Sequence, residues 1–300
     1  MPTTVKFESM ALAAAVCVVA VLFALPSRAA PPSAERGKYI FDAGGCASCH
    51  TDEKGGGKAL AGGPALKTPF GTFYAPNITP DPDFGIGRWT DAQFLNSMRN
   101  GIGPDGRQLY PVFPYTSFTK ASEQDLLDLK AYLASLAPVR QQSRAHELRF
   151  PFSIRASLLV WKWLNFAPGE WRPDASHDAT WNRGAYLVEA IVHCGECHTP
   201  RDALGGLDRK RWMAGAAMST SDLKAPNLTG GPDGLSDWTA DDIAFGLELG
   251  TTPDNEAMSG EMAEVVRNST SHLTAQDRQA IAAYIKALPP LPNAAPPSGH

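Results

Sequence analysis

The segments that decide the fold are Cys46-Ala47-Ser48-Cys49-His50 and Cys194-Gly195-Glu196-Cys197-His198, two copies of the pattern C-x-x-C-H. Cysteines three positions apart lie about one helical turn from each other on one face, where their thiols can add to the two vinyl groups of a porphyrin. The histidine that follows is then placed to bind the iron. The sequence therefore predicts two covalently bound haem c groups, held by Cys46, Cys49, Cys194 and Cys197, with His50 and His198 as axial iron ligands.

Two other uses of cysteine compete with this interpretation. Apart from Cys17 the chain has four cysteines, an even number that in an exported protein is typical of two disulfides. A C-x-x-C pair can also belong to a zinc or thiol redox site. Both copies here end in histidine, and no further Cys or His pair stands at the spacing of zinc ligands. Haem attachment is the favoured interpretation, and the disulfide and zinc alternatives remain open.

The first 29 residues have the features of a signal peptide: Lys6 near the start, an apolar run over residues 10–25, and small residues on either side of Arg28. The run is shorter than the roughly 20 apolar residues that span a bilayer. We therefore expect cleavage before Ala30 and a periplasmic protein, with an uncleaved anchor as the alternative. Cys17 lies inside this run and is interpreted as an apolar filler.

The composition is that of a globular protein. With 300 residues, of which 43% are hydrophobic and 19% charged, the chain is neither disordered nor collagen-like. The formal net charge of −4 offers no basic region large enough for a nucleic acid, so no nucleic-acid partner is expected.

The surroundings of the two C-x-x-C-H segments also match, which indicates an internal duplication. Three further pairs of segments correspond: Arg36-Gly37-Lys38-Tyr39 with Arg183-Gly184-Ala185-Tyr186, Ala75-Pro76-Asn77-Ile78-Thr79 with Ala225-Pro226-Asn227-Leu228-Thr229, and Trp89-Thr90 with Trp238-Thr239. Each Trp-Thr pair precedes an amphipathic stretch, 91–100 and 241–250, for which the threonine is the expected N-cap. Each half ends in a second such stretch, 122–136 and 274–288. The sequence predicts an all-α protein of two tandem haem domains, 30–137 and 181–290.

Residues 138–180 form the predicted linker between the two domains. The linker contains several prolines and an aromatic-rich stretch over residues 150–166, which is too apolar for a free tether. We expect it to pack across both domains and fix their mutual geometry. The alternative is a docking face for a partner subunit or for the membrane surface. Residues 291–300 are expected to be a disordered tail.

With these motifs, the chain resembles the cytochrome c subunits of membrane-associated bacterial dehydrogenases, such as the quinoprotein alcohol dehydrogenase and the flavin-dependent gluconate and sorbitol dehydrogenases. The resemblance runs from about Glu35 to Leu288, and its specific segments are Asn77-Ile78-Thr79-Pro80-Asp81, Gly85-Ile86-Gly87-Arg88-Trp89-Thr90, Leu109-Tyr110-Pro111, Trp181-Asn182-Arg183-Gly184-Ala185-Tyr186-Leu187-Val188 and Met262-Ala263-Glu264-Val265-Val266. Those subunits carry three haem domains, whereas this chain has two. The resemblance implies a dehydrogenase catalytic subunit as electron donor, a quinone, cytochrome or oxidase as acceptor, and peripheral membrane association.

The resemblance also places a methionine ligand in the loop before each terminal helix. In the second half this residue is Met262, with Met258 as the weaker candidate. The first half departs from the pattern Tyr-Pro-x-Met-Pro-Tyr of the resembling subunits, because Phe113 stands where they have methionine. Met98 is the only methionine between His50 and Pro138, at a position that is aliphatic in those subunits.

Three hypotheses for the first haem follow. Met98 has taken over as sixth ligand, the iron is five-coordinate beneath Phe113, or Met98 is a core residue of its helix. His146 and His177 in the linker are further candidates. Asn77 and Asn227 are predicted to donate hydrogen bonds to haem propionates, and the carbonyl of Pro64 is predicted to accept the proximal imidazole N–H of His50. No acceptor is predicted for His198.

Two functions are compatible with this arrangement. The first is an electron carrier that relays single electrons from a dehydrogenase through its two haems, and that is not an enzyme on its own. The second is a dihaem enzyme, of the peroxidase or thiosulfate dehydrogenase type, with an open first haem. No pair of catalytic side chains stands out in the sequence, so no catalytic residue is assigned.

Overall fold

The computed structural model describes residue 1 and residues 30–217 and 224–294. Residues 2–29 of the predicted signal peptide, Cys17 among them, lie outside the described residues, and so do residues 295–300 of the predicted tail. Pro31 begins the compact unit that contains both C-x-x-C-H segments.

Each half contains a first helix, the short C-x-x-C-H helix, and further helices in the same order. The helices of the first half are α1 (Ala34–Ala43), α2 (Cys46–His50), α3 (Asp91–Asn100), α4 (Tyr115–Phe118) and α5 (Glu123–Ala134). Those of the second half are α7 (Ala179–Tyr186), the π-helical turn η1 (Leu187–Ile191), α8 (Gly195–His198), the 3-10 turn η2 (Arg209–Arg211), α9 (Ala240–Leu249), α10 (Gly260–Asn268), the 3-10 turn η3 (Thr270–His272) and α11 (Ala275–Lys286).

Matching local signals start and end the helices α3 and α9. Thr90 and Thr239 each close a capping box at the N-terminus, as the sequence predicts. Gly101 and Gly250 end the two helices in the left-handed conformation, with φ of 59° and 70°, which glycine adopts without steric cost. The two halves therefore build the same helix from the same residue types.

The structure is largely helical, as predicted, and adds two small antiparallel sheets. β1 (Ala65–Thr68), β2 (Gly71–Tyr74) and β3 (Glu147–Leu148) form one sheet, and β4 (Ala216–Ala217) and β5 (Lys224–Ala225) form the other. Gly71 has φ of 128°, and a Cβ there would lie 2.4 Å from the carbonyl oxygen of Glu147. The pairing of β2 with β3 joins segments that are distant in the sequence, so no local pattern could predict it.

The first and last helices of each half cross at a glycine. A Cβ on Gly37 of α1 would lie 1.8 Å from the carbonyl oxygen of Asp128 on α5, and a Cβ on Gly184 of α7 would lie 1.9 Å from that of Ala280 on α11. Tyr132 and Tyr284 pack beside the two crossings. The absence of a side chain at these two glycines therefore lets the helix backbones touch.

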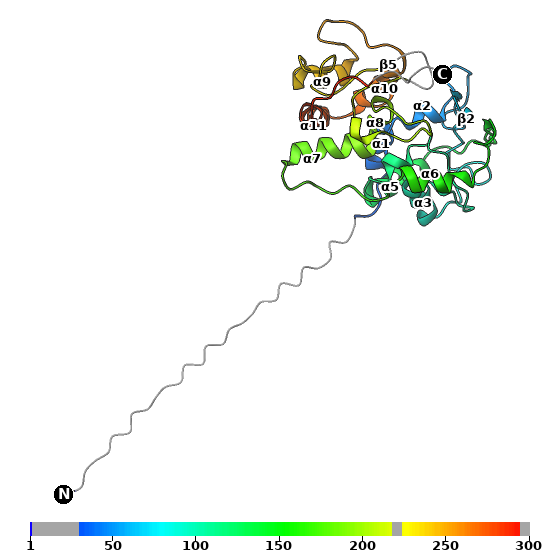
Figure 1. The fold of residues 1–300 in the computed structure, drawn as a ribbon. Helices are drawn as coiled ribbons and strands as arrows, with labels where there is room; N and C mark the ends of the chain where they lie inside the picture. Colours follow the sequence, from blue (N-terminus) through cyan, green and yellow to red (C-terminus); the bar gives the residue numbers. More distant parts are fainter. Residues whose placement is uncertain (2–29, 218–223, 295–300) are drawn as a thin grey trace. The chain divides into compact units, whose positions relative to one another are not determined.

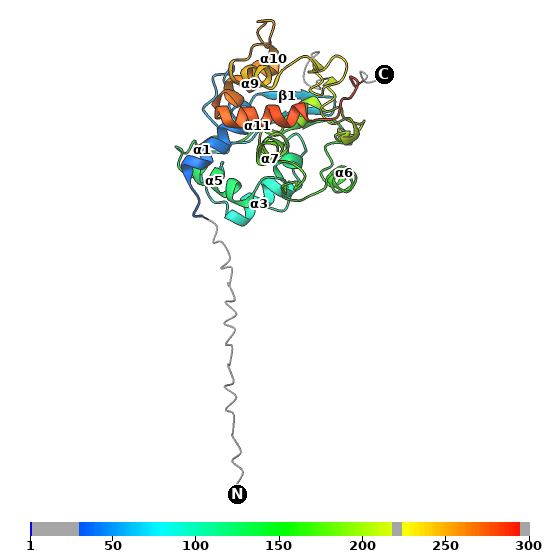
Figure 2. The ribbon, with the colours of Figure 1, turned by 90° about the vertical axis from the view of Figure 1, so that its left-hand side faces the viewer.

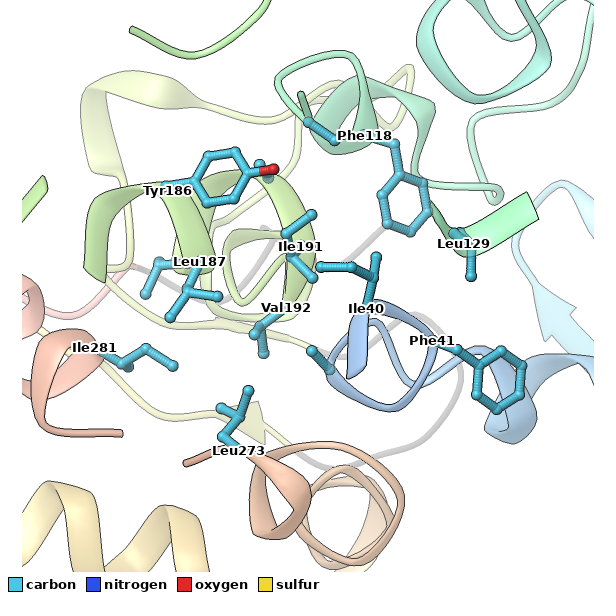
Figure 3. Close-up of a cluster of buried hydrophobic side chains, with 14 of the residues drawn as sticks. Ile40, Phe41, Phe118, Leu129, Tyr186, Leu187, Ile191, Val192, Leu273 and Ile281 are labelled. Atoms are coloured by element: carbon cyan, nitrogen blue, oxygen red, sulfur yellow. The ribbon is translucent and has the colours of Figure 1, made fainter. Parts of the chain in front are cut away.

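One hydrophobic core extends through both halves. α9, α10 and α11 lie on one side, α3 and α5 on the other, and α1 and α7 between them (Figures 1 and 2). Figure 3 shows how side chains of both halves meet in this core, which includes Ile40, Phe118, Ile191, Leu273 and Ile281. The two haem domains are therefore packed against each other.

Polar bonds across the interface repeat the same arrangement twice. The Tyr39 hydroxyl donates to Asp277 at 2.5 Å and accepts from the backbone N–H of Thr274, at the start of α11. The Tyr186 hydroxyl donates to Asp125 and accepts from the backbone N–H of Ser122, at the start of α5. Each half thus caps the terminal helix of the other with a tyrosine, which indicates an approximate two-fold relation between them.

The linker is bound on one side and exposed on the other. Lys162 of α6 (Ser157–Asn165) donates to the carbonyls of Asn100 and Gly101 in the first half, whereas the Trp161 indole donates to the carbonyl of Leu204 in the second. Leu158 is buried, and Trp163 is 82% exposed. None of the described helices is long and apolar enough to cross a membrane.

The first residues of the predicted tail are ordered, which corrects that boundary. The Leu291 backbone N–H donates to Thr229, and the Leu291 carbonyl accepts from the side-chain amide of Asn227. Ala294 donates to the carbonyl of Ala214. Residues 291–294 are therefore held against the second half by specific backbone bonds.

Gly37→Ala and Gly184→Ala should each destabilise the protein strongly, because the new methyl group would overlap a backbone carbonyl that cannot move away. Overpacking of this kind costs about 1–3 kcal/mol or more. Guanidinium denaturation measures the loss. Gly230→Ala is the matched control, since nothing lies within 4 Å of its Cβ position, and an equal loss in that variant would contradict the argument.

Candidate functional site

The histidines of the two C-x-x-C-H segments are held by the same contact. Nδ1 of His50 lies 2.7 Å from the carbonyl oxygen of Pro76, and Nδ1 of His198 lies 2.8 Å from that of Pro226. With Nδ1–H donating to this carbonyl, Nε2 is left free with its lone pair, as an iron ligand requires. The prediction that the Pro64 carbonyl accepts this bond is wrong. The acceptor is the carbonyl of the proline in the repeated Ala-Pro-Asn segment, Pro76 for His50 and Pro226 for His198.

The asparagines after these prolines hold the loop in place. Oδ1 of Asn77 accepts from the backbone N–H and the hydroxyl of Thr79, while its amide donates both hydrogens, to the carbonyls of Val139 and Gln141. No hydrogen of the Asn77 amide is left for a haem propionate, so the structure gives this side chain a different role from the predicted one.

Asn227 repeats the pattern in the second half. Its Oδ1 accepts from Thr229, and its amide donates to the carbonyl of Leu291. Both asparagines are 1–2% exposed. They fix the shape of the loop that presents the proline carbonyl to the histidine.

Burial sets the protonation state of the ligating groups. It lowers the pKa of His50 and of His198, which keeps both imidazoles neutral. Burial also raises the pKa of the Cys46 and Cys194 thiols to about 12. Cys46, Cys49, Cys194 and Cys197 form no disulfide, and among residues 30–217 and 224–294 no group of three His, Cys, Asp or Glu side chains could hold a metal ion.

The two C-x-x-C-H helices open into one continuous cavity of about 2450 Å³. A single small-molecule site usually occupies about 300–1,000 Å³, so this cavity has room for more than one large ligand. Its lining is mostly apolar and includes Cys46, Cys49, His50, Cys194, Cys197 and His198. The paired thiols, the neutral imidazole and the apolar walls in each half fit a covalently bound haem.

Each half also contacts the C-x-x-C-H helix of the other. The Thr116 and Ser117 hydroxyls of α4 both donate to the carboxylate of Glu196 in α8 at 2.8 Å, and Asn268 of α10 donates to Ser48 in α2 at 3.0 Å. Burial and the Glu196 carboxylate raise the pKa of the Cys197 thiol to about 11, and Cys49 of the first half adds to this rise. The two attachment segments therefore lie close enough to influence each other.

Three of the four methionines within residues 30–217 and 224–294 line the cavity. Met98 and Met262, the predicted sixth ligands, both belong to this lining, and so does Met258. Met213 is fully buried elsewhere, next to Thr199.

The candidate histidines differ in their surroundings. His146 lines the cavity, but its Nδ1 accepts from the backbone N–H of Tyr74, so the proton of the neutral ring sits on Nε2. His177 stacks on Trp181 at 3.7 Å and does not line the cavity. His193, which also lines it, has its Nε2 3.3 Å from the carbonyl oxygen of Gly44. None of the three offers a free Nε2 to the first iron.

Basic side chains at the cavity were missed by the sequence analysis. The cavity lining includes Arg107, Arg144, Arg155, Arg201 and Lys224. Arg144 lies over the ring of Tyr74 at 3.8 Å, and Arg155 donates to the carbonyl of Gln108. Arg107 and Arg201 already pair with Asp105 and Glu196, whereas Arg144, Arg155 and Lys224 are suited to neutralise haem propionates. Only their spatial convergence identifies these cations, since they are not adjacent in the sequence.

Comparison with known proteins supports this interpretation of the site. The cytochrome c family model matches residues 34–137 and again residues 182–289. A protein described as "Diheme cytochrome c-type" from Cereibacter sphaeroides is 48% identical over 259 residues, which cover 85% of this chain and 86% of that protein.

Other relatives are cytochrome subunits of dehydrogenases. The fructose dehydrogenase cytochrome subunit of Gluconobacter japonicus is 41% identical over 88% of this chain, and the gluconate 2-dehydrogenase cytochrome c subunit of Pantoea cypripedii is 38% identical over 85% of it. The matched segments cover 54% and 59% of these two proteins, respectively.

Replacing Cys46 and Cys49 together with alanine should lower the haem content from two groups per chain to one, because both thioether bonds to the first porphyrin are lost. The pyridine haemochrome spectrum of the purified chain, with its mass under denaturing conditions, measures this. Cys194→Ala with Cys197→Ala is the reciprocal variant and should also keep one haem, at the first site. A double variant that still carries two haems would contradict the assignment.

Proposed function

The chain belongs to the cytochrome c family and binds two haem c groups covalently, and from this premise we propose that it relays electrons from a dehydrogenase catalytic subunit to a respiratory acceptor in the periplasm. When bound, the haem irons supply one-electron redox chemistry. The chain itself holds the two attachment segments next to each other, keeps His50 and His198 neutral, and surrounds them with mostly apolar walls.

The continuous cavity carries this proposal. Separate haem domains on a loose linker would hold their cofactors at a variable distance, whereas here a shared core and reciprocal contacts hold α2 and α8 in one unit. Arg201 and the hydroxyls of Thr116 and Ser117 lower the pKa of the Glu196 carboxyl, whose burial acts in the opposite direction. The carboxylate therefore stays ionised at the junction of the two halves, bonded to both of them.

The relatives suggest the kind of donor. The names of several relatives are those of cytochrome subunits of fructose, alcohol and gluconate dehydrogenases. We extend that role to this chain as electron-transfer subunit or carrier. The acceptor is a quinone, a second cytochrome or an oxidase.

The relay is tested by isolating the tagged protein from its native host under mild conditions. We expect a dehydrogenase catalytic subunit to co-purify, and its substrate to reduce both haems, so that a reductive titration takes up two electrons per chain. Cys46→Ala with Cys49→Ala is the control and should take up one.

The dihaem enzyme is the competing function and has its own test in the same preparation. Turnover of hydrogen peroxide or thiosulfate by the purified protein, without a co-purifying dehydrogenase, would overturn the relay.

We also propose that the exposed face of the linker rests on an anionic membrane surface. Phe150 and Trp163 are each 82% exposed, and Leu159 and Val160 of α6 are 57% and 60% exposed. Between Leu148 and Gly169 the sequence has no acidic residue, although the whole chain has a net charge of −4. Lys162 and Arg155 bind carbonyls of the first half, and Arg149 is the exposed basic residue of this stretch. Exposed aromatic and aliphatic side chains beside a basic residue are suited to the lipid headgroup region.

Leu159→Ser with Trp163→Ser should weaken sedimentation of the protein with vesicles of anionic phospholipid by about tenfold, because most of the inserted apolar surface is lost. Leu249→Ser is the matched control, as Leu249 is 60% exposed on α9. If the double variant sediments like the unaltered protein, the membrane proposal fails; if it instead loses the dehydrogenase, the face is a protein interface.

A further inference from the structure

The loops that follow α3 and α9 have the same backbone structure. The Leu109 N–H donates to the carbonyl of Gly101 at 2.8 Å, and the Met258 N–H donates to that of Gly250 at 2.7 Å. An isolated antiparallel bridge joins Ile102 to Gln108 in the first loop and Thr251 to Ala257 in the second. Counted from these bonds, Phe113 and Met262 occupy corresponding positions.

The helices before these loops are also in register. Both begin after a threonine capping box and end at a left-handed glycine. Counted from those caps, Met98 of α3 corresponds to Leu247 of α9. The two side chains are 7% and 8% exposed, and both line the cavity.

Each half therefore holds one methionine and one hydrocarbon side chain at this pair of positions, and the methionine changes place between the halves. The first position is Met98 of α3 in the first half and Leu247 of α9 in the second. The second position is Phe113, just before α4, in the first half and Met262, at the start of α10, in the second. All four side chains line the cavity.

We propose that the Met98 thioether would bind the first haem iron together with His50, and that the Phe113 ring takes the place that Met262 has in the second half. Phe113 has no atom that can bind iron, and Met98 is the only methionine between His50 and Pro138. The histidines of the cavity are engaged: Nδ1 of His146 accepts from Tyr74, and Nε2 of His193 contacts Gly44. The Phe113 ring is held in place by an aromatic contact with Phe118, at 5.7 Å between ring centroids.

With Met98 as ligand, the first haem is closed to small external ligands. This proposal depends on the two haem groups and not on the identity of the electron donor. The assignment of Met98 can therefore be disproved without disproving the proposed electron relay. A thioether on a capped helix is also held by the helix backbone, and methionine ligation favours the reduced iron relative to an open site.

The test compares four variants of the holoprotein: Met98→Leu, Met262→Leu, Met98→Leu with Phe113→Met, and Met258→Leu. Leucine has nearly the volume of methionine, so the fold should persist, which the haem content and far-UV circular dichroism check. The readouts are the thioether-to-iron charge-transfer band, the spin state in EPR, and carbon monoxide binding to the reduced protein.

We expect Met98→Leu to remove about half of the charge-transfer band and to let about half of the haem bind carbon monoxide, because one of two irons loses its sulfur ligand. Met98→Leu with Phe113→Met places the ligand as in the second half and should restore a low-spin spectrum. Met262→Leu should mirror Met98→Leu at the other haem, and Met258→Leu should change nothing. The proposal is overturned if the unaltered protein already binds carbon monoxide at one haem, or if Met98→Leu keeps the full band.

Discussion

Contact between helix backbones is the constraint on which the rest of the structure depends. Gly37 and Gly184 bring the first and last helices of their halves so close that a methyl group would overlap a carbonyl oxygen of the partner helix. This crossing fixes the direction in which α1 and α7 lead into the C-x-x-C-H segments that follow them. The position of both C-x-x-C-H segments therefore depends on Gly37 and Gly184, because only a residue without a side chain allows these helix crossings.

A second constraint is the loop that orients the histidine of each C-x-x-C-H segment. In both halves a buried asparagine ties its own loop to a segment after the terminal helix, Asn77 to Val139 and Gln141, and Asn227 to Leu291. The loop thereby presents a proline carbonyl to Nδ1 of the histidine. The segment behind the terminal helix is thus connected, through the asparagine and its loop, to the orientation of the histidine.

Local sequence was sufficient for features that depend on neighbouring residues. The helices at 91–100, 241–250, 122–136 and 274–288, the threonine caps of the first two, and the repeat itself follow from residues within a few positions of one another. Pro76 was missed as acceptor because the bond joins residues whose spacing carries no signal, and Pro64 was favoured only by its distance along the chain. The β2–β3 pairing and the basic cavity lining escaped prediction for the same reason, since each arises from segments brought together only by folding.

The interface between the halves shows why two repeated domains act as one unit. Tyr39 and Tyr186 each bond the start of the other half's terminal helix, and α4 and α10 each rest on the other half's C-x-x-C-H helix. Each C-x-x-C-H helix is therefore held partly by residues of the other half, and both helices open into the same cavity. Because the two halves have corresponding helices and loops, differences between the two sites must come from side chains that differ between the repeats. Three such differences face the cavity: Ser48 against Glu196, Met98 against Leu247, and Phe113 against Met262.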